Sequence, residues 1–422
     1  MLSYEVARAK VIEVVRAIAD AAASRGPDAA DSKHLSTAER IDVAVDPPRA
    51  LGRILAESIN ADRNYPPFDR SARDGYAIRA VDAAKPGARL RVIGESRAGF
   101  PFTGRFEDDS CVRIMTGAPV PEGADAIVMQ EQTRTDGYSV IFEQVAQAEQ
   151  NIIRKGTEMR LGSLALSKGM RLGYAELAIA AQVGCTRLAV NRKPRVAILS
   201  TGDEVVGVEA TPGPFQIRNS NSVSLAAQVA LAGGEPVMLG NAPDDIGQLR
   251  AQIERGLAHD ILVLSGGVSV GKYDLVEPVL RELDAEFFFD AIAIRPGKPA
   301  VFSVCGGKPV FGLPGNPVST MVTFELLVVP AIELFGGAAA QALPLMKARL
   351  RAAVEQKAKL MHFLPARVSW PAGEAVVEAL VWQGSGDIFT LAQGNCFLVV
   401  YESKLKVDAG EWVDILPRRG ML

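Results

Sequence analysis

The sequence predicts a multidomain protein of class α/β plus β, with a doubly wound, mostly parallel α/β domain, a β-rich second domain and a small C-terminal β domain. A chain of 422 residues is long enough for about three domains. From Arg195 onwards, strand-like apolar runs alternate with helical patterns, which is the order of elements that builds a parallel sheet. Before and after this region the apolar runs are short and separated by Pro and Gly, as in antiparallel β structure.

The first elements of the chain are predicted to be helical. Apolar residues recur at helical spacing over residues 3–20, which indicates an amphipathic helix. Residues 21–40 are small and polar and are typical of a loose insertion, after which Pro48 to Ser58 has a second helical pattern. A further helical stretch runs from Tyr174 to Val183. We expect this stretch to pack back on the first helix.

Changes in pattern along the chain divide it into four predicted domains. Short β-rich runs begin at Asp62, the regular alternation of strands and helices begins near Arg195, and short alternating runs return at Met346. The predicted domains are a helical and linker domain (1–61 with 161–192), a β-rich domain (62–160), an α/β domain (193–342) and a C-terminal β-barrel-like domain (343–422).

Charge and hydropathy limit the environment and the partners. The 46 Lys and Arg nearly balance the 49 Asp and Glu, and no block of five like charges occurs, so neither a nucleic acid nor an acidic membrane surface is an expected partner. The most apolar stretch, Phe324 to Phe335, contains two glutamates and is too short to span a bilayer. The N-terminus has no basic start followed by an apolar run. We therefore predict a cytoplasmic protein without a membrane segment.

The cysteine and histidine content narrows the chemistry. The four cysteines are widely spaced and form no C-x-x-C pair, so we interpret them as reduced, packed thiols rather than as a zinc ribbon or a redox dithiol. Three histidines exclude a histidine-rich metal centre and disfavour a Ser-His-Asp triad. Carboxylates, lysines and backbone amides are left to carry the chemistry.

Polar, glycine-containing turns follow three predicted strands of the α/β domain, at Ser200 to Glu204, Ser265 to Gly271 and Leu313 to Ser319. Ligands of doubly wound sheets bind beyond the carboxyl ends of the strands, so we expect these turns to meet in one crevice. In the middle turn, a buried strand leads into Gly266, Gly267 and then a predicted helix. Backbone N–H groups at a helix start can bind a phosphate, and glycines, which have no Cβ, let the phosphate come close to them.

The same middle turn contains the core of a P-loop motif. Residues Gly266 to Lys272 spell G-x-x-x-x-G-K, but Tyr273 stands where a P-loop requires the Ser or Thr hydroxyl that binds Mg²⁺. A P-loop NTPase is therefore disfavoured, and we interpret the turn as a nucleotide or phosphate site of another kind.

Two groups of charged residues accompany the crevice turns. Glu204 and Asp274 follow neighbouring strand ends, where they could hold Mg²⁺ against a phosphate or could simply be acids favoured at helix starts. Prolines and a glycine stiffen Arg295-Pro-Gly-Lys298-Pro299, which would present two rigid cations to an oxyanion or form a surface turn. Two acids at adjacent strand ends favour the metal interpretation.

Two motifs in the β-rich domain are ambiguous when taken alone. Asp69 and Asp74 lie in a rigid turn after Pro66-Pro67, and Thr116-Gly-Ala-Pro-Val-Pro121 follows a strand. Pro-Pro and Asp-Gly are common in turns, so ordinary turns are favoured over binding loops until the whole set of motifs is considered.

In combination, six ordered motifs make the chain, from its first helix to about Gly410, resemble the molybdopterin molybdenumtransferases, the MoeA family that includes the gephyrin E domain. They are Pro66-Pro-Phe-Asp-Arg-Ser-Ala-Arg-Asp-Gly-Tyr-Ala77, Ile114-Met-Thr-Gly-Ala-Pro-Val-Pro-Glu-Gly-Ala-Asp125, Ser200-Thr-Gly-Asp-Glu204, Ser265-Gly-Gly-Val-Ser-Val-Gly271 with Asp274, Arg295-Pro-Gly-Lys-Pro299 and Leu313-Pro-Gly-Asn-Pro-Val-Ser319.

The resemblance implies that molybdate is inserted into adenylylated molybdopterin with Mg²⁺, releasing AMP and molybdenum cofactor. It implies catalytic roles for Asp69, Thr116, Glu204, Asp274 and Lys298, with Asp274 and Glu204 as metal ligands. The nucleotide and molybdopterin would be bound by Thr201, Gly202, Gly266, Gly267, Ser269, Gly271, Pro314, Gly315 and Asn316. Molybdate would be bound by Arg295, Lys298, Pro299, Ser319 and Ser385, because rigid cations and a hydroxyl make charge-assisted hydrogen bonds to a dianion.

The resemblance also implies an elongated homodimer in which Asp69 and Thr116 reach the site of the partner subunit. Other cofactor-biosynthesis proteins and apo-molybdoenzymes would be further partners. Two other activities stay open, namely a molybdopterin adenylyltransferase, which would not need the flanking β domains, and a non-catalytic scaffold. The intact set of acids and cations favours the transferase over a pure scaffold.

The sequence departs from the family pattern at a few positions. Pro365 stands where family members often have an arginine near molybdate, and Arg367, two residues on, is a candidate replacement. Ser385 fits the serine that follows in a turn. Arg295 and Glu158 stand where lysine and aspartate are common, with the charge kept.

Overall fold

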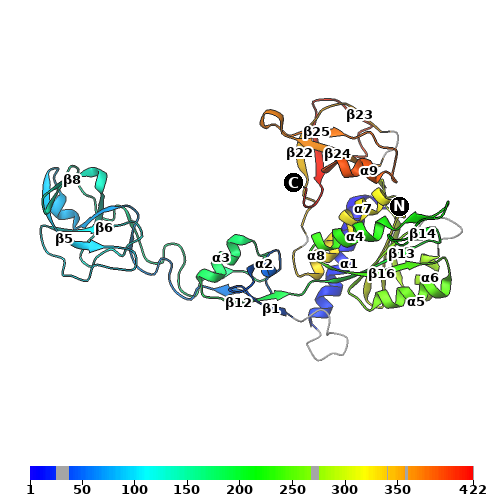
Figure 1. The fold of residues 1–422 in the computed structure, drawn as a ribbon, viewed down its shortest axis with the longest axis horizontal. Helices are drawn as coiled ribbons and strands as arrows, with labels where there is room; N and C mark the ends of the chain where they lie inside the picture. The colour runs from blue at the N-terminus through cyan, green and yellow to red at the C-terminus, as the bar shows by residue number, and fades with distance from the viewer. Residues whose placement is uncertain (25–37, 268–274, 340, 357–359, 422) are drawn as a thin grey trace.

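The computed structural model describes residues 1–24, 38–267, 275–339, 341–356 and 360–421, which form an elongated molecule (Figure 1). A β-rich region lies at one end, joined by a two-strand unit to an α/β region, and the C-terminal region lies beside the α/β region. Ser269, Gly271 and Asp274 lie outside the described residues. The overall class is the predicted one.

The α/β region is a six-stranded mixed sheet of order β16-β13-β17-β21-β20-β18. The first four strands are parallel and the last two run antiparallel to their neighbours. Alternate residues of β13 and β17 belong to two separate apolar clusters, one on each face, so both faces are covered. The strands are β13 (Arg195–Thr201), β16 (Glu235–Ala242), β17 (Ile261–Ser265), β18 (Glu286–Ala291), β20 (Pro299–Cys305) and β21 (Lys308–Leu313), with a side pair β14 (Val205–Val206) and β15 (Ile217–Arg218).

Helices α5 (Ile246–Leu257) and α6 (Val276–Glu282) cover one face of this sheet, and α4 (Ser220–Leu231) and one long helix cover the other. The long helix runs through α7 (Pro317–Thr323), a π-helical turn η4 (Phe324–Val328) and α8 (Val329–Phe335). Its 19 residues are long and apolar enough to span a membrane by composition, but 83% of the most apolar window is buried in this core. It is a buried core helix of the α/β region.

Helix α1 (Tyr4–Ser24) packs on α8. Tyr4, Ala7, Val11 and Val15 follow helical spacing and are buried in the same cluster as the sheet residues of the α/β region. The predicted contact with α3 (Tyr174–Gln182) is wrong, because α3 packs instead on β11 (Leu164–Leu166). These four residues of the apolar stripe of α1 continue the core of the sheet.

The unit between the two ends is built on β1 (Ala38–Asp42), which pairs antiparallel with β12 (Arg187–Asn191). The predicted helix from Pro48 to Ser58 is wrong, since α2 covers only Pro47–Ala50. Gly52 then adopts a positive φ of 75°, and the chain continues extended, with Leu55 bridged to Val190. Strand β1 also overlaps residues 21–40, which were expected to be loose.

The β-rich region is a six-stranded sheet of order β7-β4-β6-β5-β9-β8. Gly75 allows β4 and β7 to approach, because a Cβ there would lie 2.0 Å from the carbonyl oxygen of Val128. The strands are β4 (Gly75–Ile78), β5 (Ala88–Ser96), β6 (Ser110–Ile114), β7 (Ala126–Met129), β8 (Thr133–Asp136) and β9 (Ser139–Phe142), and shorter elements nearby are β3 (Arg70–Ser71), β10 (Ile152–Ile153), η2 (Ala80–Ala83) and η3 (Gln130–Gln132). The short strand β2 (Ile59–Asn60) pairs with β11 and belongs to the two-strand unit.

The C-terminal region is a closed barrel, since β24 pairs with both β25 and β26 and closes the series β24-β25-β22-β28-β26. Strand β19 (Ile294–Arg295) leaves the α/β region and pairs in parallel with β24, with Arg295 opposite His362. The remaining elements are β22 (Met346–Leu350), β23 (Val354–Glu355), β24 (Met361–Ser369), β25 (Val376–Ala379), β26 (Cys396–Val400), β27 (Lys406–Val407), β28 (Trp412–Pro417), η5 (Pro371–Gly373) and α9 (Ile388–Gln393).

Candidate active site

The three crevice turns meet at the carboxyl ends of β13, β17 and β21, as the strand order predicts, around a cavity of about 470 Å³ that we call the strand-end cavity. Asn219 to Asn221, at the start of α4, complete one wall. The predicted residues that line it are Thr201, Gly202, Glu204, Gly266, Gly267, Pro314, Gly315 and Asn316.

The double glycine of this cavity has a backbone that other residues do not adopt readily. Gly266 and Gly267 have φ values of 94° and 66°, and a Cβ on either would lie 2.9 Å from the hydroxyl oxygen of Thr201. Thr201 is buried, and its hydroxyl has no hydrogen-bond partner among the described residues. The end of the sheet therefore carries backbone without side chains, at Gly266 and Gly267, next to the Thr201 hydroxyl.

Acidic residues lie on the side of the strand-end cavity next to β16. Glu204 lines it, whereas the carboxylate of Asp203 accepts a hydrogen bond of 3.0 Å from the backbone N–H of Asp244. Asp244 itself lines the cavity and was missed by the sequence analysis. The signal that would have found it is the one used for the other turns, because Asp244 closely follows the carboxyl end of β16.

A second cavity, of about 550 Å³, lies between the α/β region and the barrel, and we call it the cation cavity. It shares Pro299, Pro314 and Asn316 with the strand-end cavity, so the two adjoin along one wall. All five residues that the family resemblance assigns to molybdate line it, namely Arg295, Lys298, Pro299, Ser319 and Ser385.

The local backbone explains why these segments converge. A Cβ on Gly297 would lie 2.5 Å from the methyl group of Thr323, so glycine lets the turn that carries the cations approach helix α7. The N–H of Val318, in the first turn of α7, donates a hydrogen bond of 2.9 Å to the carbonyl of Ser385. This bond attaches the barrel loop to the helix and brings both serines to one cavity.

The cations of this cavity are not neutralised by neighbours. Among the described residues, neither Arg295 nor Lys298 forms a salt bridge, although many arginines elsewhere in the chain do. His362 lies opposite Arg295 in the pairing of β24 with β19. Burial and the positive charge of Arg295 lower the pKa of His362, which keeps its imidazole neutral at pH 7. The cavity therefore has a net positive lining suited to an oxyanion.

The barrel does not supply the arginine that the family pattern led us to expect. Arg367 donates from Nε and Nη2 to the carbonyl oxygen of Gln393, at 3.0 and 2.6 Å, and does not line the cation cavity. The proposed replacement by Arg367 is therefore wrong, because its place on β24 directs it to the end of α9. The barrel residues that do line the cavity are Leu360, Trp382, Gln383, Gly384 and Ser385.

The predicted residues of the β-rich region lie far from both cavities within one chain (Figure 1). The backbone N–H and the hydroxyl of Thr116 donate to Oδ1 of Asp74, at 2.6 and 2.7 Å, and these bonds lower the pKa of the carboxyl group. Burial raises the pKa of Asp69, but the Lys155 N–H, which donates at 2.8 Å, and the Arg154 guanidinium lower it further, so that carboxylate is ionised. Asp74, named in the sequence only as part of a turn, is thus the partner of Thr116.

Comparison with known proteins places this geometry in a family. Three family models match in order, described as the MoeA N-terminal region, domain I and II (residues 2–184), a probable molybdopterin binding domain (197–334) and the MoeA C-terminal region, domain IV (347–417). A molybdopterin molybdenumtransferase of Haemophilus influenzae is 36% identical over 380 residues, which cover 88% of this chain and 93% of the relative. The chain belongs to the MoeA family. It is therefore an enzyme of molybdenum cofactor biosynthesis, a molybdopterin molybdenumtransferase.

Other MoeA proteins agree in sequence and in fold. A molybdopterin molybdenumtransferase of Nostoc sp. is 38% identical over 298 residues, covering 69% of this chain and 68% of the relative. Two solved MoeA structures from Pyrococcus horikoshii are 32% and 26% identical with TM-scores of 0.72 and 0.78. They cover 94% and 99% of this chain, and 98% and 100% of their own.

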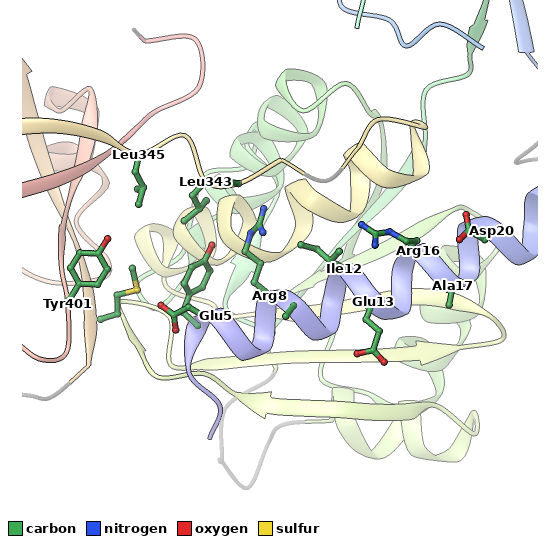
Figure 2. Close-up of a pocket in the computed structure, with 14 residues that line it drawn as sticks. Glu5, Arg8, Ile12, Glu13, Arg16, Ala17, Asp20, Leu343, Leu345 and Tyr401 are labelled. Atoms are coloured by element: carbon green, nitrogen blue, oxygen red, sulfur yellow. The ribbon is translucent and has the colours of Figure 1, made fainter. Parts of the chain in front are cut away.

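A third cavity of this MoeA chain is separate from the other two. Figure 2 shows it between the outward face of α1 and the segment that leads into the barrel, with a volume of about 780 Å³. Glu5, Arg8, Glu13 and Arg16 of α1 line it, with Tyr401 on the barrel side. None of its lining residues belongs to the predicted site.

Proposed function

We propose that this chain inserts molybdate into adenylylated molybdopterin and releases AMP and molybdenum cofactor, in a reaction that depends on Mg²⁺. The observation that carries the proposal is the pair of adjoining cavities, one built from glycine turns at strand ends and the other lined by unpaired cations. A nucleotide in the first and an oxyanion in the second would meet across Pro299, Pro314 and Asn316.

The cation cavity would bind molybdate. A tetrahedral dianion suits Arg295 and Lys298, whose positions are fixed by the prolines and the glycine between and beside them. Ser319 and Ser385 would add hydroxyl donors, and the helix α7 would present the positive end of its dipole to the anion. Binding in this cavity would place molybdate beside the wall shared with the strand-end cavity.

The strand-end cavity would bind the adenylylated pterin. Backbone amides beside Gly266 and Gly267 and the free hydroxyl of Thr201 suit a phosphate. Glu204 and Asp244 line the same cavity, and a Mg²⁺ site commonly uses one or two carboxylates completed by phosphate and water. We propose that Glu204 and Asp274 hold Mg²⁺, which would offset charge on the phosphate when the anhydride is cleaved.

The homodimer is part of the same proposal. Asp69 and Thr116 lie in the β-rich region and line neither the strand-end cavity nor the cation cavity of their own chain. In a two-fold dimer the β-rich region of one subunit would cover the cavities of the other, and both residues would complete the site in trans. We propose a cytoplasmic enzyme with the four predicted domains, which delivers its product to apo-molybdoenzymes.

A molybdate titration of AMP release tests the assignment of the two cavities. We expect Lys298→Ala to raise the KM for molybdate by at least about tenfold, because a charge-assisted hydrogen bond is lost, while the affinity for AMP stays unchanged. Glu204→Ala should lower the rate at saturating molybdate and weaken the dependence on Mg²⁺. Lys308→Ala, at the other end of β21, is the control and should match the wild type. Equal molybdate KM values in wild type and Lys298→Ala would refute the assignment.

A further inference from the structure

We propose that Asn221 is a positioning residue that holds the wall shared by the two cavities and so couples the binding of nucleotide to the binding of oxyanion. The inference rests on the proposed function of these cavities. Asn221 lies in the first turn of α4 and lines the strand-end cavity. It carries no charge and belongs to none of the sequence motifs that pointed to the site.

The amide group of Asn221 bridges two other turns. Its Nδ2 donates to the hydroxyl oxygen of Ser265 and to the carbonyl oxygen of Gly315, each at 2.8 Å. A carbonyl oxygen can only accept, so the nitrogen of the amide must face Gly315. Both amide protons are therefore used in the bridge, and Oδ1 is buried without a partner among the described residues.

The bridge fixes backbone that belongs to both cavities. Ser265 directly precedes the double glycine, and Gly315 lies between Pro314 and Asn316, which line both cavities. The two turns are also in contact, because a Cβ on Gly315 would lie 3.7 Å from the Cα of Gly266. One side chain thus sets the position of the strand-end turn and of the residues from which helix α7, with Ser319, begins.

The structure contains a matched amide without this coupling. Nδ2 of Asn241 donates to the carbonyl oxygens of Gly202 and Val205, at 2.9 and 3.2 Å, and its Oδ1 is also buried and unpaired. These bonds stay within the turn that carries Glu204 and do not reach the shared wall. Asn221 and Asn241 therefore make the same kind of hydrogen bonds, but Asn221 joins two turns at the shared wall, whereas Asn241 joins residues of one turn.

Calorimetric titration of the full-length chain with AMP and, separately, with sodium molybdate tests the coupling. We expect Asn221→Ala to raise both dissociation constants by about tenfold, since two hydrogen bonds that order the wall are lost. Asn221→Ser, whose single hydroxyl proton replaces one of the two bonds, should give intermediate values for both ligands. Asn241→Ala should raise the dissociation constant for AMP and leave that for molybdate within about twofold of wild type.

The outcomes separate the inference from the function on which it rests. A thermal melt of each variant shows whether the chain is folded at the temperature of titration. If Asn221→Ala leaves either constant unchanged, or if Asn241→Ala raises the molybdate constant equally, the coupling role of Asn221 is refuted while the proposed function stands. If folded wild-type protein binds neither AMP nor molybdate, both the function and the inference fail.

Discussion

At the scale of single residues, Asp74 fixes the orientation of Thr116, because its carboxylate accepts hydrogen bonds from both the hydroxyl and the backbone N–H of that residue. We expect Asp74→Ala to lower the rate of AMP release by about a hundredfold, since a small misplacement of a reacting group costs about that much. Thr116→Ala and the double variant should lose a similar amount, because the pair acts as a unit. Asp136→Ala, at an exposed salt bridge of the same region, is the control. Additive losses in the double variant would contradict the pairing.

His362 should make the stability of the barrel depend on pH. Burial and the charge of Arg295 lower its pKa from 6.5, so an unfolded chain takes up a proton at a pH where the folded chain does not. The stability that this group contributes is present above pH 6.5 and falls as the pH drops towards the lowered pKa. We expect the melting temperature to fall less between pH 7 and pH 5 in His362→Gln than in wild type or in the control His259→Gln. The same fall in all three proteins would argue against a neutral, buried His362.

Residue types at characteristic spacing could be predicted from sequence, and residues that act through distant partners could not. The five residues assigned to molybdate all line one cavity, because prolines and glycines restrict the backbone locally. Asn221 has partners 44 and 94 residues away, and nothing in its neighbourhood along the chain indicates a bridge. Arg367 shows the reverse error, since it lies only two residues along β24 from Pro365, yet its guanidinium donates to the carbonyl of Gln393 and does not line the cation cavity.

At the scale of elements, α1 is held by an apolar stripe that faces α8 and the sheet core. Val11 is completely buried in this contact, whereas Val6 of the same helix is 53% exposed. We expect Val11→Ala to lower the free energy of unfolding by about 2 kcal/mol, from lost burial and the remaining cavity, and Val6→Ala to change it by less than about 0.5 kcal/mol. Chemical denaturation measures both. Equal effects would show that α1 does not belong to this core.

Helices with a clear apolar period were predictable, and short ones governed by tertiary contacts were not. The stripe of α1 is visible in the sequence, but its partner is not, because α3 and α8 both offer apolar surfaces. Residues 51–58 have a helical pattern of apolar residues, yet the chain is extended there. Leu55 and the neighbouring Ile59 are buried in the core of the two-strand unit. There the extended chain gains cross-strand bonds, such as the one from Ala56 N–H to the carbonyl of Ala189, that a helix would forgo.

At the scale of the whole molecule, the alternation of strands and helices predicted the parallel sheet and the crevice at its edge. The distance of the β-rich region from that crevice was not predictable from pattern, since sequence order does not give the orientation between domains. Under the proposed assignment of Asp69 and Thr116 to the site, its parts would come together only in a dimer.

A mixing experiment tests the shared site. We expect Asp69→Ala and Asp274→Ala to be inactive alone, and equal mixtures that exchange subunits to recover about a quarter of wild-type activity, because half of the dimers would carry one intact site of two. Two Asp274→Ala samples mixed in the same way are the control. Mixtures that form heterodimers and stay inactive would show that Asp69 does not act across the subunit interface.

The most direct test of the central claim is the stoichiometry between AMP and cofactor. Purified chain, adenylylated molybdopterin and Mg²⁺ are incubated with and without molybdate, and AMP is measured together with reconstitution of a molybdenum-free apoenzyme. The two-cavity account predicts that AMP release depends on molybdate and that each AMP is matched by one molecule of active cofactor. AMP release that is independent of molybdate, or that yields no active molybdoenzyme with a dimeric, folded protein, would contradict it.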